Sequence, residues 1–462
     1  MSVDYKHRDY EANEEKWIKI RDAIKGQDAI KSKRETYLTK PNPDDTSAEN
    51  AVRYNNYLKR AVYFNVVKRT LDSLVGTAFR RYPTLESDGS LFYVETDIDG
   101  NGISIYQQSQ RVLQNILSHG RCGLLVDFPS VNESVSLADM AAGYTRANCL
   151  FYKTESIINW QHTRIGGKTL LSKVVISEDA EEVSDFETEL KERYRELSLD
   201  DGVYTVRIWE ASKDGKGLDV VDEYIPRMAN GGVWREIPFI FVGATNNDFY
   251  VDDAPLYPLV ELNLAHYQNS ADFEDSVHII GQPQPFITGL TERWAEMLEE
   301  KGVYFGSRSP LPLPQGANFG IAQAGANVLV EKAMMMKEAQ MVALGARLLE
   351  KGSAIKTATE AQADQEAETS VLALAVSNVN EAYSVIAMWM EDFMGNGSFI
   401  YEINNDFTSL SLDANKLNSL VAAWIQGAIP RSDLWGYLRR MGVIDDSKTD
   451  EEIENEVENT LL

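Results

Sequence analysis

Two stretches of the sequence carry residue types that bind phosphate or metal ions. Gly166-Gly167-Lys168-Thr169 ends like a phosphate-binding loop. That motif needs another glycine five residues before Gly167, and this position holds His162. The lysine also stands between two strand-like segments, so we interpret residues 166–169 as the turn of a hairpin.

The second stretch resembles part of a calcium-binding loop. Residues 97–102, Asp-Ile-Asp-Gly-Asn-Gly, match its positions one, three, five and six, where oxygen ligands converge around a tight glycine turn. Position twelve requires a bidentate glutamate, and it is Gln108, whose neutral amide removes a charge and a ligand. The sequence favours a turn leading into a helix that Ser104 caps, and it leaves calcium binding to Asp97–Gln108 open.

The remaining histidines, cysteines and serines form no recognisable catalytic or metal-binding pattern. His266 and His278 share a predicted helix but are twelve residues apart, too far for one ion. Two cysteines, Cys122 and Cys149, suffice neither for a disulfide framework nor for a metal quartet. We therefore predict no enzyme, no catalytic residues, no metal and no cofactor. A hydrolase or nuclease with an unrecognised site stays an alternative.

The charge of the chain argues against tight DNA binding. It has 71 acidic and 45 basic side chains, a net charge of −26. Proteins that hold nucleic acid do so with lysine and arginine, so specific binding is disfavoured, whereas DNA passing along a repelling wall is compatible with this charge. The start lacks a signal peptide, and no window approaches about 18 uncharged apolar residues. We expect that the protein has no membrane partner and that it folds in a reducing cytoplasm.

Hydrophobic periodicity predicts an α+β fold that is mainly helical. Residues 9–81 read as helices with one break at 40–45, and a helix from Ser104 to Leu117 precedes a strand at 124–126. Alternating segments predict four further strands: Lys173–Ser177, Val203–Trp209, Val220–Ile225 and Phe239–Val242. Residues 178–201 hold 11 acidic and 3 basic side chains, which predicts a solvated helix or loop.

The second half is predicted to be helical around a small mixed module. One helix covers 254–279 and another 328–350, in which Met334, Met341 and Leu348 repeat every seven residues. Between them we expect a short helix at 291–301 and a strand at 303–305. A capping box at 357–360 predicts a helix from there to Met394. A strand at 399–403, helices near 413–426 and 431–441, and an acidic tail from Asp445 complete the prediction.

The order of several motifs suggests a family. The stretches that carry the resemblance are YLKRA (57–61) followed by Asn65, GTAFRRYP (76–83), HGRCGLLVDFP (119–129), IPF (237–239), PL (255–256) through ELNLAHYQNSADFE, GQP (281–283), ALGARLL (343–349), TATEA (357–361) and ETSVLALA (368–375). In this order they resemble tailed-bacteriophage portal proteins, in particular a branch catalogued as a domain of unknown function. The matches span about residues 37–440.

The resemblance implies the portal fold with wing, stem, clip and crown regions. The implied division is a wing of helices and antiparallel sheet at 1–250, a first stem helix at 251–280, a clip at 281–327, a second stem helix at 328–350, a tunnel loop at 351–356, a long wing helix at 357–397, and the end of the wing, the crown and an acidic tail at 398–462.

The resemblance also implies a function and partners. A portal subunit forms a ring, typically a dodecamer, at one capsid vertex of the virion, and double-stranded DNA passes through it non-specifically during packaging and ejection. The implied partners are the terminase packaging motor, head–tail connector or neck proteins and the major capsid protein, with assembly in the host cytoplasm. The residues expected to face DNA, each of which could equally be a solvated surface side chain, are Lys332, Lys337, Arg347, Lys351 and Lys356.

Two alternatives remain open at this point. The methionines at 334–336 could pack on a neighbouring subunit or fill a core within the chain. The chain could also be another virion assembly protein, a neck or baseplate component, which uses the same apolar helices without enclosing a DNA channel.

Overall fold

The fold is α+β in a computed structural model of the chain. The structure describes residues 2–128, 146–184, 187–212, 217–282, 284–302, 313–322, 328–348, 370–405, 407, 414–440, 444 and 448–454. Contacts divide the chain into two compact units, Met1–Asn405 and Asp406–Leu462. The first unit holds all the sheets named below; the second contains α12 (Ala414–Ile425) and α13 (Arg431–Arg440), close to the predicted helices.

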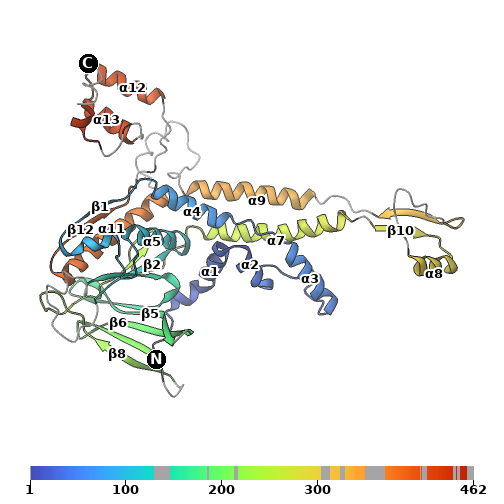
Figure 1. Ribbon diagram of the computed structural model, residues 1–462, viewed down its shortest axis with the longest axis horizontal. Helices are drawn as coiled ribbons and strands as arrows, with labels where there is room; N and C mark the ends of the chain where they lie inside the picture. Colours follow the sequence, from blue (N-terminus) through green and yellow to red (C-terminus); the bar gives the residue numbers. More distant parts are fainter. Residues whose placement is uncertain are drawn as a thin grey trace. The chain divides into compact units, whose positions relative to one another are not determined.

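The N-terminal region contains more helices than predicted (Figure 1). They are α1 (Arg8–Lys25), α2 (Gln27–Ser32), the 3-10 turn η1 (Arg34–Thr36), α3 (Ala48–Arg60) and α4 (Val66–Ala78). The predicted break at 40–45 is confirmed, and two others were missed. Gly26 ends α1 with φ +93°, a backbone conformation that favours glycine, and Ala61–Asn65 form an extended linker between α3 and α4.

A three-stranded antiparallel sheet and two helices form the centre of the first unit. The strands are β2 (Arg121–Asp127), β3 (Asn148–Lys153) and β9 (Phe239–Gly243), with β2 in the middle. Helix α5 (Ile105–His119) begins as predicted, because Ser104 Oγ accepts a hydrogen bond from Gln107 N. Helix α11 (Val371–Met394) packs on α5, β2 and β9, so the buried sheet has helical cover.

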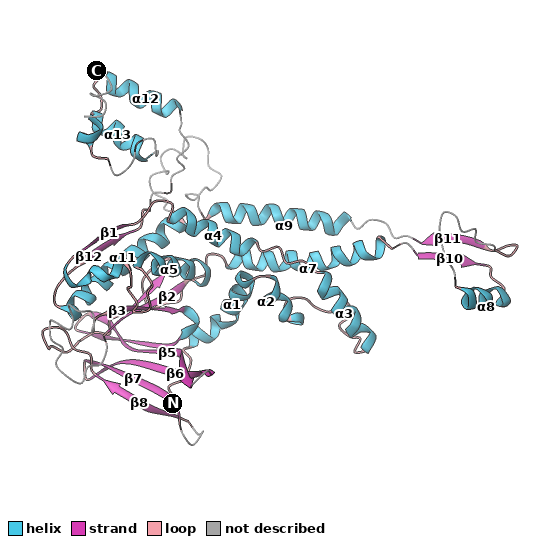
Figure 2. Ribbon diagram, viewed as in Figure 1, coloured by secondary structure: helices cyan, strands magenta, loops and turns pink. Residues whose placement is uncertain are grey.

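A five-stranded antiparallel sheet follows the chain order from β4 to β8 (Figure 2). Its strands are β4 (Ile157–Ile165), β5 (Lys168–Ser184), β6 (Glu187–Asp200), β7 (Val203–Ala211) and β8 (Leu218–Tyr224). The prediction of a helix or loop at 178–201 was therefore wrong. Some of its charged side chains are buried rather than solvated: Arg195 and Glu196 are buried next to Leu197, and Arg195 pairs with Glu178 inside the sheet region. The predicted hairpin turn at Gly166-Gly167 is confirmed, with positive φ at both glycines.

Helix α11 departs from its predicted start. Ser370 has extended backbone angles and its Oγ accepts a hydrogen bond from Ala373 N, so this helix begins at Val371 and not at Thr357. The capping box at 357–360 lies outside the described residues. Leu372 N donates to Leu348 O at 3.3 Å, which joins the start of α11 to the residue that follows α9.

By length and composition α11 could span a membrane, so the expectation that no segment approaches this limit was wrong. In this fold α11 is a core helix. Its residues Ala375, Ala382 and Ile386 are fully buried against neighbouring elements of the first unit. The other face of α11 meets water through Ser377, Glu381 and Met388, so this helix is half-buried on the core of the first unit.

The predicted helix–module–helix order is confirmed in the region after residue 256. Helix α7 (Tyr257–Ile280) and helix α9 (Val328–Arg347) contact each other, and the chain between them forms β10 (Gln284–Thr288), α8 (Glu292–Lys301) and β11 (Asn318–Ala322). The predicted strand at 303–305 lies outside the described residues. A separate two-stranded sheet pairs β1 (Thr84–Ser87) with β12 (Phe399–Glu402), and the 3-10 helix η2 (Gly89–Glu95) follows β1.

Candidate assembly surface

Polar side chains of α7 bind the backbone of the linker between α3 and α4. Asn263 is fully buried; its Oδ1 accepts from Val66 N at 3.1 Å and its Nδ2 donates to Phe64 O at 2.9 Å. Ser270 Oγ donates to Val62 O at 2.7 Å and accepts from Val62 N at 3.1 Å. These buried bonds satisfy linker groups that have no partner in a helix or sheet. They explain why the sequence ELNLAHYQNSADFE carries polar residues on an apolar helix.

The C-terminal half of α7 is bound to α3 by two further contacts. Tyr57 Oη donates to Asp272 Oδ1 at 2.7 Å, and Arg60 forms an ion pair with Asp275. Burial and the neighbouring Asp272 carboxylate raise the pKa of Tyr57 well above its usual range, so its hydroxyl stays protonated and donates. Helix α7 is therefore held on α3 and α4 from one side.

Helix α7 also contacts α9. His266 Nε2 lies 3.2 Å from Glu338 Oε1, and Lys337 Nζ donates to Asn269 Oδ1. Met341 is 1% exposed and lies against residues of α4. The heptad residue Met334 is half-buried, so the predicted Met334–Met341 stripe belongs to the contacts within one chain.

The opposite face of α9 is apolar and uncovered in the single chain. Its exposed residues, with their exposed fractions, are Val328 47%, Leu329 80%, Met335 62%, Met336 59% and Val342 70%. Large apolar side chains gathered on an exposed helix face are usually covered by another surface. The methionines at 334–336 thus lie on two faces of α9. Met334 packs within the chain, whereas Met335 and Met336 are exposed and can contact another surface.

A groove between α4 and α9 continues this exposed face. It encloses ≈ 580 Å³ and is lined mainly by Phe64, Val66, Leu74, Met341 and Val342. Gly345 widens it, because a Cβ there would lie only 3.4 Å from Thr70 Cγ2. Phe64 is 52% exposed although it is aromatic, which again marks an incompletely covered apolar surface.

The module between the two helices also exposes apolar side chains. In the β10–β11 pair, Ile287 lies opposite Phe319 and Pro285 opposite Ile321, so these residues share one face. Phe319 and Ile321 are exposed. On the other face Phe286 covers Gly320, where a Cβ would meet the phenyl ring at 2.5 Å. A two-stranded sheet is marginal by itself, and this one leaves apolar side chains exposed among the described residues of the module.

The residues predicted to face DNA are only partly described. Lys332 is exposed on α9, whereas Lys337 bonds to Asn269 and is half-buried. Arg347 is the last residue of α9, and its side chain lies outside the described atoms, as do Lys351 and Lys356 altogether. The structure therefore places only Lys332 and Lys337 of the five, and their role in facing DNA stays a prediction.

The loop at Asp97–Gln108 uses its polar groups internally. Asp97 Oδ1 accepts from Gly102 N at 2.8 Å and Asp97 also pairs with Arg146. Burial, which would raise the pKa of Asp97, is outweighed by these donors, and the pKa lies below its usual value. Gln108 points away into the core, where its Nε2 donates to Cys149 O at 2.6 Å. Across the described residues, no group of three or more His, Cys, Asp or Glu could hold a metal ion.

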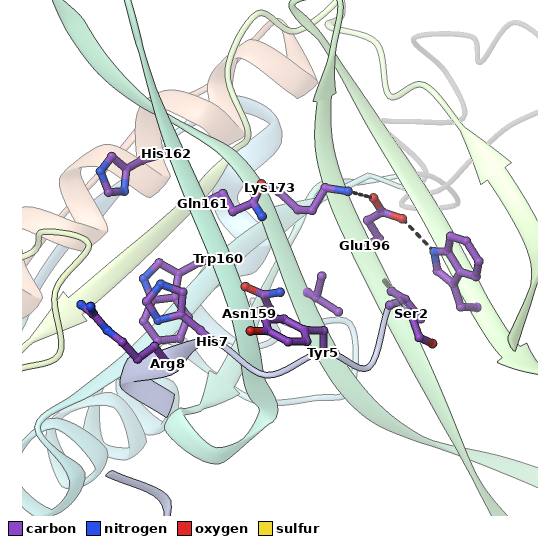
Figure 3. Close-up of a pocket in the computed structure, with 13 residues that line it drawn as sticks. Ser2, Tyr5, His7, Arg8, Asn159, Trp160, Gln161, His162, Lys173 and Glu196 are labelled. Atoms are coloured by element: carbon purple, nitrogen blue, oxygen red, sulfur yellow. Dashed lines mark hydrogen bonds and ion pairs between the residues drawn. The ribbon is translucent and has the colours of Figure 1, made fainter. Parts of the chain in front are cut away.

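A cleft beside the five-stranded sheet was missed by sequence reasoning (Figure 3). It encloses ≈ 730 Å³ between the N-terminal segment and strands β4 to β7. His7 stacks on Trp160 with ring centroids 4.0 Å apart, and Trp209 Nε1 donates to Glu196 Oε2 at 2.8 Å. Lys173 pairs with the same carboxylate. The charges of Lys173 and Glu196 are thus already paired. Among the residues that line the cleft, no nucleophile is hydrogen-bonded to a base that could activate it.

Two buried charge sites were also missed. Arg195 Nη1 lies 3.0 Å from Asp127 Oδ2 and its Nε lies 2.8 Å from Glu178 Oε1. Burial would raise the pKa of Glu178, but Arg195 and Tyr152 outweigh it and hold the pKa below its usual value. Arg121 is 1% exposed and stacks over Trp160 at 3.8 Å. Burial lowers the pKa of Arg121 to about 9. No sequence motif signals either site, because their partners come from distant strands.

Comparison with protein families finds a match over the second half of the chain. Residues 255–394 match the family model described as Domain of unknown function (DUF4055). This range includes α7, the β10–α8–β11 module, α9 and α11. The comparison with curated proteins gives no match.

The structural neighbours of the chain include chains of gene transfer agent particles and a phage portal protein. A chain of the virion of a native gene transfer agent particle is 13% identical with a TM-score of 0.40, over 84% of this chain and 92% of that one. A chain from the neck of an empty gene transfer agent particle has 13% identity, a TM-score of 0.41 and coverage of 82% and 91%. The third, a HK97 family phage portal protein from Corynebacterium diphtheriae, has 9% identity, a TM-score of 0.29 and coverage of 77% and 95%. The chain is thus similar to DUF4055 over residues 255–394, and its structural neighbours include a phage portal protein.

Proposed function

We propose that the chain is a portal subunit of a tailed bacteriophage. Copies form a closed ring at one capsid vertex of the virion, and double-stranded DNA passes through the ring during packaging and ejection. The terminase motor, neck proteins and the major capsid protein are its partners, and the ring assembles in the host cytoplasm. The role is structural, without a catalytic centre.

The observation that carries this proposal is the exposed apolar face of α9. A single chain leaves Leu329 and Val342 mostly in water, and covering such a face stabilises an assembly by about 25 cal/mol per Å² removed from water. The β10–β11 pair exposes a second apolar surface, and it lies within the stretch proposed as the clip, 281–327. Both surfaces fall inside the DUF4055 match.

The net charge suits a conduit better than a DNA-binding protein. Each copy contributes −26, so a ring of copies repels phosphate along most of its surface. Weak cationic contacts from Lys332, Lys351 and Lys356 would then guide DNA without retaining it. These residues remain proposed DNA contacts, as do the boundaries of wing, stem, clip, tunnel loop and crown.

The oligomer size of the purified full chain and the shape of its assemblies in electron micrographs test the proposal. Mass photometry should find a high-order oligomer, and negative-stain electron microscopy should show closed rings with an axial channel. A compact stable monomer would contradict ring formation. Assemblies without an axial channel would favour a neck or baseplate component instead.

Charge reversal tests the DNA path separately. Lys351→Glu with Lys356→Glu should reduce packaged DNA while the ring still forms. The matched control is Lys168→Glu, whose side chain is 72% exposed in the β4–β5 hairpin and pairs with Glu236. Normal packaging by the double variant would exclude these lysines from the path.

A further inference from the structure

The exposed apolar side chains of α9 lie in two parallel lines. One line is Val328, Met335 and Val342, and the other is Leu329, Met336 and Ala343. Residues seven apart lie nearly above one another, because seven residues make almost two helical turns. Adjacent residues differ by about 100° around the axis, so the two lines occupy two flanks of the same face.

Rotational symmetry relates these two flanks to each other. A closed ring is generated by rotation alone, which moves nothing along the ring axis. For a helix that runs along this axis, each residue of one copy is therefore level with the same residue of the next. The line containing Met335 is then level with the line containing Met336 in the neighbouring copy.

We propose that neighbouring copies pack through unlike flanks of α9, with the Val328–Met335–Val342 line of one copy against the Leu329–Met336–Ala343 line of the next. This interface is heterologous, and it deepens the proposed ring function, on which it rests. Ala343 is small, so the backbones can approach closely where it meets Val342. Lys332 lies between the two lines and stays uncovered when both flanks are buried.

Charge favours a second copy as the partner of this face. Copies with a net charge of −26 repel each other, and they approach most easily through a surface without net negative charge. The exposed face of α9 meets this condition: both lines are apolar, and residues 328–343 contain two acidic and two basic side chains, so this stretch has no net charge. A strongly basic partner would gain nothing from such a face.

The contact continues beyond α9. Val342 belongs to the first line and also lines the groove between α4 and α9, whose floor includes Phe64 and Met341. The neighbouring copy's second flank therefore meets the groove as well as the helix. This continuity matters because a specific interface needs about 800 Å² from each partner, more than one flank of a 20-residue helix supplies.

Cysteine cross-linking between two populations tests the interface. One population carries Met335→Cys with an affinity tag, and the other carries Met336→Cys. The natural cysteines, Cys122 and Cys149, are 0% exposed, so a bismaleimide reagent reports on the introduced thiols. We expect a cross-linked dimer in assemblies mixed from both populations and loss of this dimer in either population alone.

Alternative outcomes separate the interface from the function. Closed rings that cross-link in neither sample, or that cross-link within one population alone as a two-fold contact would, overturn this interface and leave the ring proposal intact. A chain that remains monomeric by mass photometry overturns both. Leu190→Cys, 65% exposed on β6, serves as the control and should not cross-link to Met336→Cys.

Discussion

Helices α9 and α11 have similar compositions but differ in how much of their surface the chain itself buries. Both α9 and α11 are rich in Ala, Val, Leu and Met. Helix α11 buries Ala375, Ala382, Ile386 and Met390 completely against sheet and helix, whereas on α9 Met341 alone among the described side chains is buried. The comparison shows that a single chain completes the core around α11 by itself but leaves the outer face of α9 uncovered. Changes inside that core should therefore affect folding, and changes on the outer face of α9 should affect assembly.

The largest expected loss of stability comes from the buried ion pairs of the β5–β6 region. Arg195→Met leaves the buried Asp127 without its ion-pair partner and should lower the free energy of unfolding by about 3–5 kcal/mol. Glu178 keeps its contacts with Arg193 and Tyr152. Chemical denaturation measures the loss. The matched control is Arg207→Met, whose partner Glu223 is 53% exposed and which should cost under about 1 kcal/mol. Equal losses in both variants would refute the distinction.

A pH titration tests the burial of His119 at the end of α5. Burial lowers its pKa from 6.5 to about 4, so the folded protein keeps the neutral ring while the unfolded chain is protonated first as pH falls. The free energy of unfolding should therefore fall by about 3 kcal/mol from this residue between pH 6.5 and 4. His119→Asn should remove that part of the pH dependence. An unchanged slope would mean that the ring is accessible to solvent.

Removing a hydrogen bond between α7 and the linker should give the next largest loss in the free energy of unfolding. Asn263→Ala removes the side chain that bonds Val66 N and Phe64 O, which then keep only the hydrogen bond to each other, and it should cost about 2 kcal/mol. Asn269→Ala is the control, because Asn269 bonds to the partly exposed Lys337 and its loss should cost less. Thermal unfolding of both variants compares them directly.

The smallest effect on folding is expected on the outer face of α9. Leu329→Gln changes a side chain that is 80% exposed, so the free energy of unfolding of the isolated chain should change by under about 0.5 kcal/mol. The same variant should reduce assembly in mass photometry. If it destabilised the isolated chain as much as Asn263→Ala, this face would already be covered within one copy, and the contrast with α11 would disappear.

Periodicity was sufficient to predict α7, α9 and the strands β7 to β9, because each has one repeating pattern of apolar residues. It failed at 178–201, where long-range pairing decides the structure: Glu178 and Arg195 are charged, yet they bury each other between strands. The start of α11 was misplaced because Thr357 and Ser370 are both good helix caps, and sequence alone did not choose between them.

The assembly surface was predictable in part. The heptad Met334–Met341–Leu348 was found by its spacing, but it belongs to the inner face of α9. The outer lines at 328–343 also repeat every seven residues, and only the position of α7 decides which repeat remains exposed. The cleft beside β4 and the site of Arg121 depend on residues far apart in the sequence, and no local pattern indicates them.

The hydrogen bond from Leu372 N to Leu348 O fixes two points of the chain beside each other, one on either side of residues 349–369. Because both ends are already held, natural relatives could differ in the length of this stretch without any displacement of α9 or α11. The entropy of closing a loop rises only with the logarithm of its length, so ten inserted residues would cost about 0.3 kcal/mol. Insertions and deletions are therefore expected to accumulate here sooner than within either helix.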